Sequence, residues 1–206
     1  MKKLGYYVLG ALLLTACGNS KQSSEADTDS IAEAAVDEMV EAVVGYTQIT
    51  KDSVGGVVVG HPMFTLPDSI PGLYTHRVPD ASPDAVTMIF SDNDGEQFVA
   101  YDFGEGNVDV ISVVGHSVKV NSPEGEFGLG DAFTKVLALP GVETEWINLD
   151  DEGSWYWKWD GLWFAPSPAG LTEAVSRKLY NSAEAPASED FTDAVTIGYI
   201  GTGLPF

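Results

Sequence analysis

The pattern of hydrophobic and polar positions divides the chain into four parts. A largely apolar run lies between Leu4 and Leu14, and residues 18–30 contain no strong hydrophobe. Residues 31–45 repeat apolar side chains at helical spacing. Beyond Thr47, short runs rich in Val, Ile and aromatic residues alternate with turn residues, a pattern typical of strands. We therefore expect a globular domain over residues 46–206.

The helical pattern predicts an N-terminal helix over residues 31–45. Ser30 and Glu33 have the spacing of a capping box, and Gly45 is a suitable C-terminal stop. The apolar stripe is narrow, and Asp37 and Glu41 repel each other at i,i+4. This helix therefore needs a partner surface to be stable.

Short strands dominate the rest of the chain and predict an α+β fold, mainly antiparallel sheet with a few helices. The predicted strands are Val54–Val59, Val86–Ser91, Gln97–Phe103, Val108–Val114, Trp146–Leu149, Ser154–Trp159, Leu162–Ala165 and Ala194–Ile200. A second helix is predicted from about Ala169 to Tyr180. A short helix is predicted after Gly130, with Asp131 as its N-cap.

The globular part also carries an internal similarity. "GGVVVGHPMFTLPDSIPGLYT" and "GEFGLGDAFTKVLALPGVET" place Gly55 opposite Gly125 and Gly60 opposite Gly130, an offset of 70. This predicts two related halves as a tandem repeat, residues 49–116 and 118–201, with chance similarity among glycine-rich strands as the alternative. In this plan the chain resembles the duplicated α+β modules of secreted binding and inhibitor proteins, such as the beta-lactamase-inhibitor-like repeat of bacterial envelope lipoproteins.

The start of the chain carries the most specific chemistry. Lys2 and Lys3 precede the apolar run, which is about 16 Å long as a helix and too short to span a bilayer. A basic segment followed by a short apolar one is typical of a secretory signal peptide. The run ends in Leu14-Thr15-Ala16-Cys17, which resembles the lipobox of bacterial lipoproteins.

That resemblance implies cleavage after residue 16 and attachment of diacylglycerol and a further acyl chain, such as palmitate, at Cys17. Residues 17–30 then form a flexible tether. Gly18 is not the aspartate that retains enteric lipoproteins in the inner membrane, so we expect an outer-membrane anchor in the cell envelope. The lipid anchor is then the membrane contact, and an ordinary signal peptide with an incidental cysteine is the alternative.

Charge and cysteine content narrow the possible functions. The chain has 31 acidic and 10 basic residues, a net charge of −21 at pH 7. Such a field repels nucleic acid and anionic head groups, so we expect no nucleic-acid partner. Cys17 is the only cysteine, and its lipidation leaves no thiol for catalysis, metal binding or a disulfide.

Four of the five tryptophans lie in "SWYWKWDGLWFAP", residues 154–166. Asp160-Gly161 is a strong hairpin signal, and strand alternation then separates two faces. The apolar face, which we expect in the core, contains Trp155, Trp157, Trp159, Leu162 and Phe164. The other face carries Tyr156, Lys158 and Trp163 with Ala165, and we expect it to be half exposed. Tyr156, Lys158 and Trp163 are therefore the candidate ligand surface.

No motif identifies an enzyme. Asp92, Asp94 and Glu96 lack the spacing of a calcium loop and fit a hairpin turn. The three histidines are scattered, and neither a nucleophile elbow nor a phosphate loop occurs. We therefore assign no catalytic residue, no metal and no cofactor, although a carboxylate pair among the acids stays open. The sequence favours a non-catalytic protein-interaction or structural lipoprotein, with an envelope protein as the unknown partner. The alternative is glycan binding by stacking on Tyr156 and Trp163.

Overall fold

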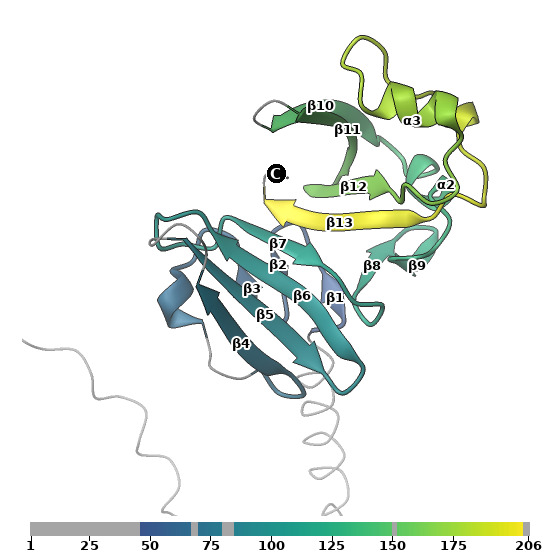
Figure 1. Ribbon diagram of the computed structural model, residues 1–206. Coiled ribbons are helices and arrows are strands. Elements are labelled where there is room, and N and C mark those ends of the chain that lie inside the picture. Colours follow the sequence, from purple (N-terminus) through teal and green to yellow (C-terminus); the bar gives the residue numbers. More distant parts are fainter. Residues whose placement is uncertain (1–45, 67–69, 80–84, 150–151, 204–206) are drawn as a thin grey trace, which may run out of the picture. The chain divides into compact units, whose positions relative to one another are not determined.

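The computed structural model describes residues 46–66, 70–79, 85–149 and 152–203 (Figure 1). The predicted signal peptide, tether and N-terminal helix lie outside the described residues. Every residue that the structure describes belongs to one compact unit of the chain, Glu38–Phe206.

The smaller of two sheets has five strands. In the order β3-β2-β1-β8-β9, it contains β1 (Gln48–Ile49), β2 (Ser53–Val54), β3 (Val57–Val58), β8 (Lys119–Ser122) and β9 (Gly125–Gly128). The pairing of β1 with β8 is parallel, and the other pairings are antiparallel. Strands far apart in the sequence thus meet in the middle of this sheet.

The larger sheet has eight antiparallel strands in the order β10-β11-β12-β13-β7-β6-β5-β4. They are β4 (Tyr74–Pro79), β5 (Val86–Asp92), β6 (Gly95–Asp102), β7 (Val110–Val113), β10 (Glu143–Leu149), β11 (Glu152–Trp159), β12 (Leu162–Pro166) and β13 (Ile197–Gly203). Strands β4 to β7 and β10 to β13 each follow one another, and β7 pairs with β13 at the centre. The mainly antiparallel sheet of the predicted α+β fold is confirmed, and the described residues are much richer in strand than in helix.

The predicted tryptophan hairpin is confirmed. Trp159 pairs with Leu162 and Lys158 with Trp163, as expected for a two-residue turn. Asp160 and Gly161 have φ of 47° and 78°, the positive values that a type I′ turn requires at both central positions. The acidic segment before β6 is also a hairpin turn, because Asp92 pairs with Gly95.

The helices are short. They are η1 (Met63–Thr65), α2 (Thr134–Leu137), α3 (Glu173–Leu179) and η2 (Ser188–Asp190). Helix α3 is shorter than predicted and begins after Thr172, whose hydroxyl accepts from the amide of Val175. The prediction of Asp131 as the N-cap of α2 is wrong: its Oδ2 accepts from Gly128 N at 2.9 Å, and the cap position is Phe133.

A single core cluster joins the two sheets and the helices. Its largest fully buried members in the eight-stranded sheet include Phe90, Phe98, Ile111, Phe164 and Ile200. The other elements contribute Val54, Val57, Val120 and Phe127 from the small sheet, with Val136, Val175 and Leu179 from α2 and α3. One face of the large sheet therefore packs against everything else that the structure describes.

Candidate binding surface on the eight-stranded sheet

The second face of the large sheet can be traced by strand register, because directly paired residues share a face. One unbroken row of pairs crosses all eight strands. From β10 to β4 it consists of Glu143, Lys158, Trp163, Gly201, Ser112, Val99, Ile89 and His76. We call this the open face; it also includes the residues two positions along the strands, among them Tyr74, Tyr101, Tyr156 and Tyr199.

The helices that the structure describes pack on the opposite, core face. Met63 of η1 and Leu179 of α3 belong to the core cluster, whereas Val99 and Trp163 are buried but lie outside it. Figure 1 shows β1–β3 behind β4–β7, and no described helix or strand lies in front of these four strands. No described helix or strand therefore packs across strands β4–β7 of the open face. At β11 the end of α3 does approach this face, because Ser154 Oγ donates a hydrogen bond to the carbonyl of Leu179 at 3.4 Å.

Tyrosine side chains meet near the centre of the open face. The rings of Tyr156 and Tyr199 lie 5.8 Å apart at an interplanar angle of 81°, an edge-to-face arrangement. Tyr199 lies across Gly201, where a Cβ would stand 2.2 Å from the Tyr199 hydroxyl. Ser112 Oγ donates a long hydrogen bond, 3.5 Å, to that hydroxyl. The small residues at the sheet centre thus make room for a large one.

The pKa values of the tyrosines on the open face are raised above the ordinary value for a phenol. Burial raises the pKa of Tyr199 to about 12. The hydrogen bond from Ser112 lowers this pKa, whereas Tyr156 and Tyr101 raise it further. Burial also raises the pKa of Tyr156, with Tyr180 adding to the effect, and that of Tyr101, with Glu96 adding to it. At neutral pH the phenols therefore stay uncharged and present hydroxyl groups that donate and accept hydrogen bonds.

The candidate ligand surface proves to be partly accessible. Tyr156 and Lys158 are half-buried on the open face, as predicted. Trp163 is only 4% exposed, so the expectation that it is half exposed is wrong. The physical reason is its central position and the Lys158 ammonium, which stands 4.8 Å from the centroid of its ring. The predicted residues do lie together, but the Trp163 ring is not free to stack on a sugar.

Sequence reasoning missed the other half of this surface. Tyr101 and Tyr199 belong to strands that were predicted, but nothing local indicates that Tyr199 approaches Tyr156 or that Tyr101 acts on Tyr199. The approach depends on β13 lying between β12 and β7, which brings together residues 43 or more positions apart. Comparison with protein-family models, with curated proteins and with solved structures gives no match.

The charges of the open face lie mainly at its margin. Glu143 and Glu145 are exposed on the edge strand β10, and Glu96 is exposed at the start of β6. Lys158 is the one lysine or arginine among the described open-face residues of the row and its flanking positions. Acidic residues therefore lie at the β10 edge and at the start of β6, and the aromatic centre carries one cation, Lys158, among the described residues.

Two further features, a metal-binding group and a membrane-spanning helix, were sought among the described residues. Among them, His, Cys, Asp and Glu side chains form no group of three able to hold a metal ion. A helix long and apolar enough to cross a membrane does not occur in the same residues.

Proposed function

We propose that this chain is a lipid-anchored cell-envelope protein that binds a protein partner, without catalysis, through the open face of its eight-stranded sheet. The observation that carries the proposal is a sheet face lined by Tyr156, Tyr199 and Tyr101, with no described helix or strand in front of its strands β4–β7. Tyrosine and tryptophan are enriched where proteins meet, because they offer a large contact area and a polar group. Glycine and serine at the sheet centre also fit a binding surface, because these small residues allow adaptable hydrogen bonding beside the large aromatic rings.

The charge pattern supports a basic partner. The chain carries a net charge of −21, and Glu143 and Glu145 stand at the edge of the face. Opposite charge on the partner would steer the encounter and fix its orientation, and the effect would decrease with added salt. We therefore expect a partner with apolar and aromatic contacts at the centre and lysine or arginine at the margin.

The anchor is the second part of the proposal. Cys17 follows Leu14-Thr15-Ala16 as in a lipobox, and several acyl chains hold a protein to a bilayer without a spanning helix. Cys17→Ser is expected to prevent acylation and to release the chain from membranes, as fractionation and mass spectrometry would show. Equally firm membrane association of the variant would contradict the lipobox interpretation.

We also propose that the two halves of the fold are copies of one module. Three backbone hydrogen bonds recur at the same places. They join Gly60 to Val108, Val108 to His61 and Met63 to Gly106 in the first half, and Gly130 to Ile197, Ile197 to Asp131 and Phe133 to Val195 in the second. Gly60 and Gly130, 70 residues apart, share a φ of 83°.

The strand pairing at the sheet centre supports the same relation. Ile197 follows Val108 by 89 residues, and Gly201 follows Ser112 by 89. Ser112 and Gly201 also pair with each other in the antiparallel contact of β7 with β13. A two-fold relation between the copies would therefore pass through this pair, and it would join two four-stranded units into one continuous open face.

The binding proposal is tested by two variants that add the same side chain to opposite sides of the molecule. Ile89 is half-buried on the open face, and Ala138 is an exposed residue at the end of α2. Each is replaced by lysine, and the full-length chains are cross-linked in envelope extracts. Ile89→Lys is expected to reduce capture of a partner at least tenfold, and Ala138→Lys to leave it unchanged. Equal capture by both variants would contradict the proposal.

A further inference from the structure

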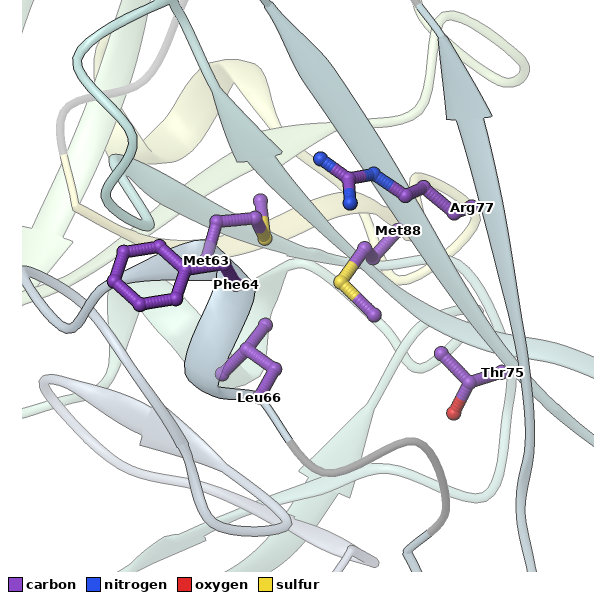
Figure 2. A pocket seen from close by; sticks show the side chains of 6 residues that line it. All are labelled: Met63, Phe64, Leu66, Thr75, Arg77 and Met88. Atoms are coloured by element: carbon purple, nitrogen blue, oxygen red, sulfur yellow. The ribbon is translucent and has the colours of Figure 1, made fainter.

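A cavity lies at the opposite side of the sheet, beneath its β4 edge. It has a volume of about 260 Å³ and is lined by Met63, Phe64, Leu66, Thr75, Arg77 and Met88. Figure 2 shows these side chains around one space, with η1 on one side and β4 and β5 on the other. An engineered cavity of about 150 Å³ binds benzene, so this one has room for a ring with a short side chain.

The lining combines a soft apolar interior with unsatisfied polar groups. Met63 and Met88 are buried, and Phe64 is 78% exposed beside them. Thr75 Oγ1 is buried and has no hydrogen-bond partner in the described structure, which is unusual because buried hydroxyls are nearly always paired. Arg77 makes no ion pair with any described residue, although acidic residues outnumber basic ones threefold. Its side chain reaches from β4 toward Met63 (Figure 2).

The corresponding place in the second half is filled. Met63 corresponds in sequence to Phe133, 70 residues later. Met88 on β5 corresponds to Trp157 on β11. Met88 directly precedes Ile89 and Trp157 directly precedes Lys158, and both Ile89 and Lys158 belong to the open-face row. Phe133 and Trp157 meet at 5.0 Å between ring centroids, and Phe191 stands 5.1 and 5.4 Å from them. These aromatic rings pack where the first half has methionines.

The source of the third ring explains the difference. Phe191 belongs to the segment between β12 and β13, which includes α3 and η2. The connection between β6 and β7, residues 103–109, is much shorter, and its aromatic residue, Phe103, is 53% exposed and stacks on Tyr101 instead of entering the core. The first half therefore keeps a cavity at a place that the second half closes with its own chain.

We propose that this cavity binds a small amphipathic monocarboxylate. The Arg77 guanidinium binds the carboxylate, and the Thr75 hydroxyl donates a hydrogen bond to one of its oxygens. An aromatic or branched apolar group of the ligand lies between Met63 and Met88, whose flexible thioethers adapt to its shape. Phe64 covers the bound group from the solvent side. This proposal does not depend on the open face or on the anchor.

The test uses the full-length chain labelled with carbon-13 at the methionine methyl groups, and 3-phenylpropionate as the probe. Binding is expected to shift the Met63 and Met88 methyl signals in a saturable way. The neutral analogue 3-phenylpropan-1-ol is expected to bind at least tenfold more weakly. Absence of a saturable shift at millimolar probe would overturn the proposal.

Two pairs of variants locate the site. Arg77→Gln, at an exposed position, is expected to weaken the carboxylate at least tenfold and leave the alcohol unchanged, whereas Arg177→Gln on α3 is the control and changes neither. Met63→Phe, which copies Phe133, is expected to abolish binding, and the volume-conserving Met63→Leu to retain it. Unchanged 3-phenylpropionate binding in Arg77→Gln would overturn the proposal even if Met63→Phe failed to fold.

Discussion

Strands β4–β7 and strands β10–β13 are each arranged in sequence order in the sheet but cover different interiors. Under β10–β13, Phe133, Trp157 and Phe191 form an aromatic cluster in edge-to-face and tilted contacts. Under β4 and β5, Met63 and Met88 leave a cavity of about 260 Å³. The same strand order is thus compatible with tight aromatic packing or with an adaptable space, and the length of the connection that supplies Phe191 accompanies the difference.

The largest expected effect concerns the aromatic cluster. Trp157 is 3% exposed, and Trp157→Ala is expected to lower the free energy of unfolding by about 3–5 kcal/mol through the cavity that it leaves. Met88→Ala, at the matching place in the first half, is expected to cost about 2 kcal/mol, the low end for methionine, because its side chain already borders a cavity. Urea unfolding of both variants measures the difference, and equal losses would contradict the comparison.

A smaller effect is expected on the open face. Trp163→Ala should cost roughly 2–3 kcal/mol, the value of burying one large side chain. Trp163 lies outside the core cluster, and the Lys158 side chain above it can move into the space that is left. The same urea experiment applies, with Trp163→Phe as the conservative variant. A loss as large as that of Trp157→Ala would mean that the open face is as tightly packed as the core face.

The matched glycines sharpen the comparison of the two halves. Gly60 and Gly130 both have a φ of 83°, where an L-residue costs about 1–2 kcal/mol. A Cβ at Gly60 meets no atom within 4 Å, whereas one at Gly130 lies 3.3 Å from His116 Cε1. Both Gly60→Ala and Gly130→Ala are expected to lower the free energy of unfolding by this amount, and Gly130→Ala is expected to lower it slightly more. A neutral result at either position, measured by thermal unfolding, would show that the local backbone conformation is not shared.

The smallest expected effect concerns the segment that only the second half has. The Lys178 ammonium, bonded at 2.8 Å, and the backbone amide of Ala187 hold the pKa of Asp190 below its usual range. A lowered carboxyl pKa stabilises the fold above the unfolded value of about 3.9, and this stability is lost as the pH falls through the lower folded value. The advantage of the wild type over Asp190→Asn should therefore be constant near pH 7, begin to decline at about pH 4 and disappear once the pH is below the folded pKa of Asp190. A pH-independent difference in melting temperature would contradict this prediction.

The parts of the fold that depend on neighbouring residues were predictable. Asp160-Gly161 indicated the hairpin, and strand alternation then placed Trp157, Leu162 and Phe164 in the core, where they are buried. Strands β1, β4, β8 and β9 were missed, and the single strand predicted over Val54–Val59 is wrong, because Val54 of β2 pairs with Val57 of β3 across a tight turn. Strand β4 is a polar edge strand that ends at Pro79, and β8 and β9 are four-residue strands with few hydrophobes. Such strands carry little signal because pairing with other strands, and not their own composition, stabilises them.

The sequence by itself determined the alternation of faces, the turns and the charge of this protein, since these depend on residues a few positions apart. Only the tertiary structure decided what those faces meet. Tyr199 reaches Tyr156 because β13 lies between β12 and β7, and Trp163 is buried because Lys158 covers its ring. The cavity beside Arg77 exists because the connection between β6 and β7 supplies no counterpart of Phe191. Strand order and the filling of space are properties of the whole chain, so no local pattern records them.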